Sequence, residues 1–402
     1  MNARVEAAVG AFARDFGRRT AIYLESCVRC GNCALACPFY LETGDPKYTP
    51  IWKVELFRRA YRGRKITEAQ LREWEPLLYD SCTMCGRCTA ACPMGIDIAS
   101  LVGQARHGMF AAGFVPPDLK GSAERAASEG SPLGATPRVL RERLEWLADE
   151  HGVPMHLDLP VADVLATFSS VEIMKYPASL VATARILEHA GHAWTISSRG
   201  YEATNFGMLA GSVEWQRQTT MKIVEAAIAC KAKVVVLPEC GHAYTALRWQ
   251  GANVYGRPLP FRVLHISEFL AENLENGRIR VTPLDKSAAF HDPCQLSRRG
   301  GASSAPRRVL AALGVQLKEC EDSGELSFCC GGGGGVIANS RADDLRRKAL
   351  AIKMGQIDAT GAELTLTSCA NCRLSFDDGR EFYRWDRKMG SLLELVADRL
   401  AA

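Results

Sequence analysis

The sequence predicts a multidomain α+β protein in which a helical, cysteine-rich domain precedes a duplicated α/β domain. Eight of the 16 cysteines lie between Cys27 and Cys92, in two motifs separated by helical periodicity over residues 51–78. From about residue 156, short β-branched runs alternate with longer helical patterns, which is typical of parallel strands joined by helices. One helix–turn–strand–cysteine pattern occurs twice, over Ile228–Tyr244 and Ile357–Arg373, and this repeat indicates the duplication.

The composition is that of a globular protein. The 402 residues suffice for two or three domains, and 47% of them are apolar. The net charge of +4 gives no argument for binding nucleic acid or an anionic membrane. The N-terminus lacks the apolar core of a signal peptide, and no apolar run approaches the length of about 18 residues that spans a bilayer. We therefore expect a soluble protein of a reducing compartment, whose cysteines bind metal or do redox chemistry.

Four regions follow one another along the chain. Residues 1–20 predict a helix or an arm, residues 21–115 the helical domain, and residues 156–402 the duplicated domain. Residues 116–155 are rich in Pro, Gly and Ser and predict a linker, within which Val139–Leu147 has a pattern compatible with a helix. Within the duplicated domain the pattern predicts strands over residues 192–197, 234–237 and 363–367, and helices over residues 215–229 and 342–359.

The two N-terminal cysteine motifs share one spacing, Cys-x-x-Cys-x-x-Cys-x-x-x-Cys-Pro. Three thiolates at this spacing wrap one face of a cubane iron–sulfur cluster, while the fourth leaves on a short helix and reaches the other cluster. Gly31 and Gly86 let backbone amides approach the sulfurs. Zinc sites favour CxxC pairs with a longer gap, so the spacing argues against zinc. The motifs predict two cubane [4Fe–4S] clusters, the first held by Cys27, Cys30, Cys33 and Cys92, and the second by Cys37, Cys82, Cys85 and Cys88.

A second cysteine constellation lies near the C-terminus. It consists of Cys294, the vicinal pair Cys329 and Cys330, and the pair Cys369 and Cys372. A vicinal pair cannot easily place both thiolates on one tetrahedral metal, but it can bridge neighbouring irons of a larger cluster. Each cysteine is expected at a strand end, where α/β folds place their sites. We expect the five cysteines to converge.

Three segments carry a resemblance to a known family: HDPC at 291–294, FCCGGGGG at 328–335 and SCANC at 368–372. A lone cysteine, CCG and CxxC in this order resemble the CCG-domain family of heterodisulfide reductase subunits and of the iron–sulfur subunits of lactate, glycolate and glycerol-3-phosphate oxidation. The N-terminal motifs resemble the helical ferredoxin domain of respiratory iron–sulfur subunits. The fused order resembles the heterodisulfide reductase D subunit. The glycine run and ECGHAY (239–244) look closest to the K subunit of the sulfite-reductase-associated electron transfer complex.

The resemblance implies that the five C-terminal cysteines hold a noncubane [4Fe–4S] cluster. It further implies the catalytic subunit of a larger complex, which reduces or oxidises a disulfide or trisulfide of a small carrier protein or thiol cofactor. A membrane cytochrome b-type or quinone-reactive partner would supply electrons and hold this cytoplasmic chain at the inner face of the membrane. One alternative is the iron–sulfur subunit of a flavin-dependent hydroxy-acid or glycerol-3-phosphate dehydrogenase, and another is an electron relay without catalysis.

Several residues keep two interpretations. Cys240 is the one site cysteine left in the first half, and it is either a thiolate beside the noncubane cluster or a relic. His242 is either a proton donor beside the same cluster or an ordinary histidine. Because the other cysteines are missing there, no second noncubane cluster is expected. Gly331–Gly335 fits no phosphate-binding fingerprint and is expected to give room for substrate or for close approach of the backbone to the cluster. Ile51–Lys65 either docks a membrane partner or, as favoured, packs on its own domain. Two cysteines without companions are expected to be buried thiols, Cys230 and Cys320.

Overall fold

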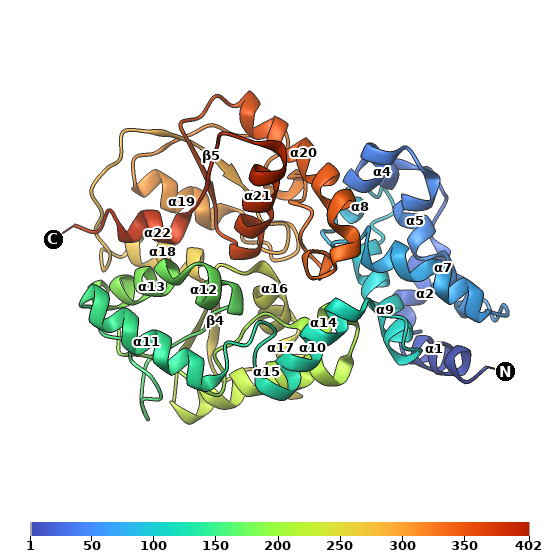
Figure 1. Cartoon of the computed structure of the whole chain (residues 1–402), viewed down its shortest axis with the longest axis horizontal. Coiled ribbons are helices and arrows are strands. Elements are labelled where there is room, and N and C mark those ends of the chain that lie inside the picture. The colour runs from blue at the N-terminus through green and yellow to red at the C-terminus, as the bar shows by residue number, and fades with distance from the viewer. Residues whose placement is uncertain (1, 402) are drawn as a thin grey trace.

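The computed structural model describes residues 2–401 (Figure 1). A helical N-terminal domain lies at one end of the molecule, beside two α/β halves that lie one above the other in this view. The predicted fold class, a helical domain followed by α/β halves with parallel sheets, is confirmed. Among the described residues, no helix combines the length and the apolar character needed to cross a bilayer.

Short helices build the N-terminal domain, and their apolar faces hold them together. Residues 1–20 were expected to form a helix or an arm, and within the part of them that the structure describes two helices occur, the first of which packs along the last helix of the domain. Gly108 permits this contact, because a Cβ there would stand 2.1 Å from the ring of Phe12. The helices are α1 (Ala3–Arg14), α2 (Arg18–Glu25), α3 (Asn32–Leu35), α4 (Pro38–Thr43), η1 (Pro46–Tyr48), α5 (Pro50–Lys53), α6 (Glu55–Tyr61), α7 (Glu68–Tyr79), α8 (Arg87–Ala90) and α9 (Ile98–Ala111).

The stretch Ile51–Lys65 contributes most of α5 and all of α6, and several of its apolar side chains face the interior of the domain, while Trp52 is 40% exposed. Val54, Leu56 and Phe57 are fully buried in the same core as α1 and α9. The favoured prediction, a helical stretch packed on its own domain, is confirmed for these side chains.

Residues 116–155 differ from the linker that we predicted, because they form two packed helices. Both α10 (Pro117–Glu129) and α11 (Pro137–His151) carry proline in the first helical turn, where its missing N–H costs nothing. Both end at a left-handed glycine, Gly130 and Gly152. The apolar face of α10 is buried in the core of the helical domain, and that of α11 in the core of the α/β halves. The Pro and Gly residues that suggested a loop are therefore helix boundaries.

Each α/β half contains a four-stranded parallel sheet. The strand orders β2-β1-β3-β4 and β6-β5-β7-β8 coincide when one half is laid over the other, which confirms the predicted duplication. Strands predicted over residues 192–197, 234–237 and 363–367 correspond to β2, β3 and β7. The strands are β1 (Val164–Ala166), β2 (Trp194–Ile196), β3 (Val234–Leu237), β4 (Arg262–His265), β5 (Ser287–His291), β6 (Gln316–Leu317), β7 (Leu364–Thr367) and β8 (Met389–Ser391).

Helices cover the sheets, and those predicted over residues 215–229 and 342–359 are α15 and α20. The carboxyl ends of β3 and β7 meet at the seam between the halves, where the Ala370 N–H donates to the Glu239 carbonyl at 2.7 Å. The helical segments are α12 (Ser170–Lys175), α13 (Pro177–His189), α14 (Phe206–Ala210), α15 (Val213–Ala229), α16 (Gly241–Tyr244), η2 (Thr245–Trp249), α17 (Gly251–Tyr255), α18 (Ile266–Glu275), α19 (Ser304–Ala312), η3 (Gly324–Leu326), η4 (Val336–Ala338), η5 (Ser340–Ala342), α20 (Asp343–Ala359), α21 (Ala370–Tyr383) and α22 (Leu392–Ala397).

Candidate iron–sulfur centres

The first set of four cysteines surrounds one cavity of about 390 Å³ in the helical domain. Cys27, Cys30 and Cys33 come from the first motif and Cys92 from the second, so the crossed grouping that we predicted is present in the structure. Burial, joined by the other three thiols of the set, raises the pKa of Cys33. Thiols bind a metal as thiolates, so a cluster bound at this cavity would displace the protons that burial otherwise retains on the sulfurs.

The second set surrounds a neighbouring cavity of about 400 Å³. Cys82, Cys85 and Cys88 line it together with Cys37, which caps the start of α4. Burial raises the pKa of Cys88 well above its ordinary value, and Cys85, Cys82 and Cys37 add to the effect in that order. The structure therefore brings together both predicted sets of cysteines, each set around a cavity of its own.

The two cysteine loops have the same backbone conformation. Arg29 (φ 56°) and Met84 (φ 52°) occupy corresponding places in the two motifs, and both adopt the left-handed region that non-glycine residues avoid. Gly31 (φ 86°) and Gly86 (φ 75°) repeat this two residues later. Left-handed residues within such loops turn successive N–H groups toward one side, as in backbone nests that bind anions. The shared strain fits loops shaped around the same kind of ligand.

Lys53 lies beside the second set and was missed by the sequence analysis. Its side chain is buried, with its Nζ 3.7 Å from the Sγ of Cys37, and it also donates to the carbonyl of Ser81. A buried ammonium requires an anionic partner, which the thiolates of a bound cluster would provide. The only signal in the sequence is a lysine within the apolar run of residues 50–57.

The five C-terminal cysteines also converge, as predicted. Cys330 Sγ lies 3.3 Å from Cys372 Sγ, Cys329 contacts both Cys294 and Cys330, and Cys369 contacts Cys372. All five are 1–7% exposed, and no cysteine within residues 2–401 forms a disulfide. Hydrogen bonds from Cys329 and Cys372 hold the pKa of Cys330 well below its ordinary value, and one from Cys372 lowers that of Cys369. A buried set of soft thiol donors, two of them biased toward thiolate, fits an iron–sulfur cluster.

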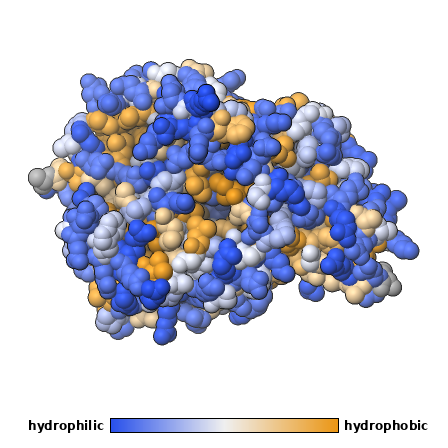
Figure 2. Space-filling model, viewed as in Figure 1, coloured by the Kyte–Doolittle hydropathy of each residue, from blue (hydrophilic) through white to orange (hydrophobic). Residues whose placement is uncertain are grey.

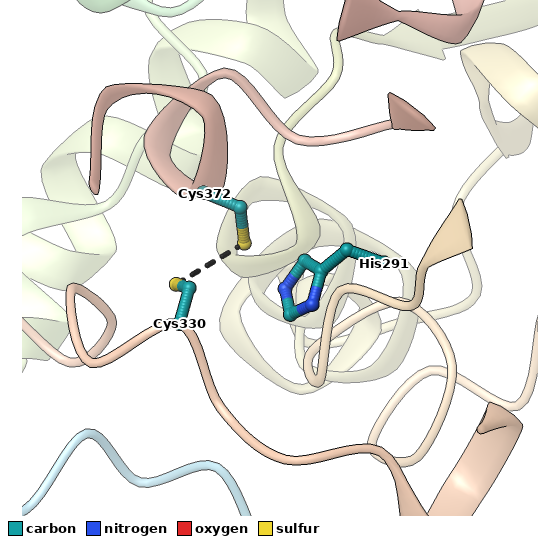
Figure 3. A group of neighbouring side chains, drawn as sticks. All are labelled: His291, Cys330 and Cys372. Atoms are coloured by element: carbon teal, nitrogen blue, oxygen red, sulfur yellow. Dashed lines mark hydrogen bonds between the residues drawn. The ribbon is translucent and has the colours of Figure 1, made fainter. Parts of the chain in front are cut away.

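His291 joins this set from the end of β5 (Figure 3). One of its ring nitrogens and the Sγ atoms of Cys330 and Cys372 all lie within 4.8 Å of one another. Burial lowers the pKa of His291 to about 3, and the ring packs edge-on against Phe376 with centroids 5.0 Å apart. The sequence analysis quoted His291 as part of HDPC and gave it no role. Its place three residues before Cys294 was the one available signal.

The loop of the second cubane set lies directly against the C-terminal cysteines. The Sγ of Cys329 is 3.2 Å from the Thr83 hydroxyl oxygen, and a hydrogen bond with Cys329 raises the pKa of Cys85 well above its ordinary value. Side chains that follow Cys294 fasten the same loop: Gln295 donates to the Met84 carbonyl at 2.8 Å. Cys85 therefore touches both groups of cysteines.

Cys240 and His242 lie together at a cavity of about 420 Å³ on the seam between the halves. Burial and the nearby Cys369 raise the pKa of Cys240 to about 12, which favours a thiol over the thiolate that we expected. Burial, with Arg106 next in size, lowers the pKa of His242 to about 4. Its Nε2 accepts the Gly334 N–H at 3.2 Å, so the neutral ring carries its proton on Nδ1. Both residues are thus interior, and both face the same cavity.

The cavity is apolar, and its outer surroundings can be followed on the molecular surface. Besides Cys240 and His242 it is lined by Thr204, Phe206, Leu209, Ile337, Asn371 and three glycines of the CCG loop. Figure 2 shows apolar side chains gathered around a hollow in the middle of this face, where Figure 1 places α16 and α21.

The glycine run allows close approach of backbone rather than anion binding. A Cβ on Gly334 would stand 2.7 Å from the carbonyl carbon of Thr83, and one on Gly331 2.5 Å from the Arg346 carbonyl oxygen. The run therefore fits between the second cubane loop and α20, while its other edge lines the cavity. The close approach seen here is to protein backbone, and the predicted approach to the cluster stays a prediction. Cys230 and Cys320 are buried thiols, as predicted.

Comparison with known families agrees with these two groups of centres. The chain matches the family described as a 4Fe-4S dicluster domain over residues 23–96, which contain both cubane sets. It matches the family described as a cysteine-rich domain, CCG, over residues 288–377, which contain the five C-terminal cysteines.

Similar proteins extend the likeness to nearly the whole chain. The D subunit of the dihydromethanophenazine:CoB–CoM heterodisulfide reductase from Methanosarcina barkeri is 27% identical, with 94% of each chain covered. The Hdr-like menaquinol oxidoreductase iron-sulfur subunit 2 of Archaeoglobus fulgidus is 27% identical, with 94% of this chain and 80% of the relative covered. The EtfAB:quinone oxidoreductase of Syntrophomonas wolfei is 27% identical, with 91% of this chain and 56% of the relative covered.

One solved structure shares the fold. A hypothetical protein from Helicobacter pylori matches with a TM-score of 0.51 at 10% identity, covering 87% of this chain and 66% of that one. The relatives named above do not bear on the finer likeness to the K subunit, which stays a prediction. Their names agree with the order of domains and with the cysteines that the fold brings together. The chain thus contains a 4Fe-4S dicluster domain and a CCG domain, and over nearly its whole length it is similar to heterodisulfide reductase D subunits and Hdr-like iron–sulfur subunits.

Proposed function

We propose that this chain is the catalytic iron–sulfur subunit of a complex that reduces a disulfide or trisulfide. Two cubane clusters in the helical domain carry electrons one at a time to a noncubane [4Fe–4S] cluster at the five C-terminal cysteines. That cluster supplies the two single electrons that cleave the sulfur–sulfur bond, with two protons taken up by the products. The substrate is carried by a small protein or is a thiol cofactor, and the reverse reaction oxidises the corresponding thiols.

The seam cavity is the observation that carries this proposal. Cys240 and the backbone of the CCG loop line this cavity. Cys240 lies close enough to Cys369 for Cys369 to raise the pKa of Cys240. An electron relay has no need of an apolar cavity beside its last cluster, whereas a sulfur substrate must reach that cluster in a site shielded from water. The Cys240 thiol retains its proton and is placed to donate a hydrogen bond to a sulfur that leaves.

The proposed electron entry is the first cubane set, because this set reaches the surface. Cys30 is exposed, and three apolar side chains around the set are largely exposed as well: Val28, Leu35 and Met94. Exposed apolar side chains beside a redox centre suit the docking of a partner at short distance. We assign this face to a membrane cytochrome b-type or quinone-reactive subunit, in line with the names of the menaquinol and quinone oxidoreductase relatives. Such a partner would hold the chain at the inner face of the membrane.

The proposal is tested on the oxidised holoprotein by electron paramagnetic resonance, with 2-mercaptoethanol and its disulfide as probes. We expect the signal of the C-terminal cluster to change when the probe binds, while the reduced cubane signals keep their shape. A C-terminal signal that stays the same at saturating probe would refute substrate binding at this cluster.

A relay function is the second candidate, since the likeness to an EtfAB:quinone oxidoreductase favours electron transfer from a flavoprotein. In that case the chain accepts electrons from a flavin-bearing partner, as an iron–sulfur subunit of a dehydrogenase would, and touches no disulfide. Unchanged spectra with both probes, together with rapid reduction of all clusters by a flavoprotein donor, would support the relay.

A further inference from the structure

His291 is a buried polar side chain without a hydrogen-bond partner. It is 1% exposed, and neither ring nitrogen has a partner among residues 2–401. Burying an imidazole without compensating hydrogen bonds is unfavourable, so native proteins pair such groups with protein, water or a ligand. The neighbours shown in Figure 3 are the sulfurs of Cys330 and Cys372, which belong to the proposed cluster site.

The geometry of these three groups suits a single metal ion. Ligand atoms that bind one ion at about 2.0–2.3 Å lie at most about 4.6 Å from one another. In the structure, one atom each from His291, Cys330 and Cys372 lie within 4.8 Å of one another, which small side-chain rotations would close. The Phe376 ring packs edge-on against the imidazole and limits its rotation away from the sulfurs.

An imidazole ring offers one nitrogen lone pair, which is the donor that histidine uses toward iron.

The duplicated fold supplies a comparison within the chain. His291 pairs with Thr367, which lies two residues before Cys369. In the first half, Ala166 pairs with Val236. Continuing that register by two residues places Phe168 opposite Pro238, two residues before Cys240. The half that lacks the cysteine set thus has a buried phenylalanine where the half that keeps it has the histidine. The histidine accompanies the cysteines, and a role in packing alone would be met by phenylalanine.

We propose that His291 is a nitrogen ligand of the C-terminal cluster, binding an iron that Cys330 and Cys372 also hold. This inference rests on the cluster proposed above and adds a sixth side chain to its five cysteines. A neutral imidazole adds no negative charge to the cluster, whereas a further thiolate would, so His291 would complete the coordination of this iron without making the cluster a poorer electron acceptor.

The test is pulsed electron paramagnetic resonance on holoprotein that contains ¹⁵N-labelled histidine. We expect the paramagnetic state of the C-terminal cluster to show a strongly coupled nitrogen that changes with the label. The coupling should vanish in His291→Gln. It should remain in His242→Gln, which alters the histidine at the seam cavity, and in His265→Gln, which alters a buried histidine with an unpartnered Nε2 in the first half.

Each other outcome overturns the assignment. A C-terminal cluster that shows only weak histidine coupling identifies a hydrogen bond and not a ligand, and so does a strong coupling that survives in His291→Gln. If His291→Gln fails to assemble the cluster, the labelled wild-type protein and the labelled His242→Gln variant still test the assignment. Strong coupling that is lost in His242→Gln would identify His242 as the ligand and overturn the assignment to His291. Absence of any third cluster, with both cubane signals intact, would refute the proposed function together with this ligand. A third cluster without histidine nitrogen would refute the ligand alone.

Discussion

Replacing Lys53 by methionine should lower the reduction potential of the second cubane cluster. The ammonium lies 3.7 Å from Cys37 Sγ, so its charge is about 6 Å from the cluster centre. At an effective dielectric constant of about 20, one unit charge at that distance contributes about 2.8 kcal/mol. Because a positive charge favours the more negative reduced cluster, its loss shifts a one-electron potential downward by about 120 mV. Methionine keeps most of the buried volume of the lysine stem.

The assay is a redox titration of the holoprotein followed by electron paramagnetic resonance. Lys47→Met provides the matched control, because Lys47 is on the same side of the domain but exposed and paired with Asp45. Exposed charges are screened by solvent and salt, so the control should shift no potential by more than about 20 mV. A shift of less than about 30 mV in Lys53→Met, or an equal shift of all clusters, would refute the placement of this charge beside the second cubane.

Four further substitutions test other parts of the structure. Cys329→Ser should remove the third cluster and leave about eight irons per chain, and about 12 irons retained would contradict the ligand assignment. Arg106→Met should lower the free energy of unfolding by about 3–5 kcal/mol in denaturant titrations, because the buried guanidinium donates to two carbonyl groups of its own domain and two of the α/β halves. The exposed Arg138→Met should change the free energy of unfolding by less than about 0.5 kcal/mol. Burial raises the pKa of Glu172 from 4.5 to about 7, so its contribution to the free energy of unfolding is complete below pH 4.5 and is lost as the pH rises through 7. The loss amounts to about 3 kcal/mol, and Glu172→Gln should flatten this decline. Cys240→Ala should slow disulfide turnover with all clusters intact, and unaltered turnover would make Cys240 a relic.

Sequence spacing was sufficient for the cysteine sets because ligand motifs are local. The fixed separations in each motif, closed by Cys-Pro, already required Cys37 and Cys92 to exchange places between the clusters. Thr83, Lys53 and His291 could not be found in this way, because each acquires its role by contact with a residue distant in the chain: Thr83 meets Cys329 only when the domains are folded together.

The linker prediction failed for a different physical reason. Proline and glycine punctuate helices as well as loops, and in 116–155 they mark the first turns and the C-caps of α10 and α11. The helical periodicity of Leu140, Leu144 and Leu147 was the competing signal, and these side chains are fully buried. Burial against the neighbouring half, which composition does not encode, determined the outcome.

The strand registers show where the seam cavity lies within the duplicated plan. If Phe168 corresponds to His291, the residue three positions later, Val171, corresponds to Cys294, and Cys240 corresponds to Cys369. Val171 and Cys240 both line the seam cavity. The first half therefore has its cavity at the place where the second half gathers its cysteines. If one copy of a duplicated domain lost its other cluster ligands, a space lined by apolar side chains and one thiol would remain there. That space would lie beside the cluster proposed for the other copy. The duplication by itself thus places the seam cavity beside the C-terminal cysteines, without any insertion into the fold.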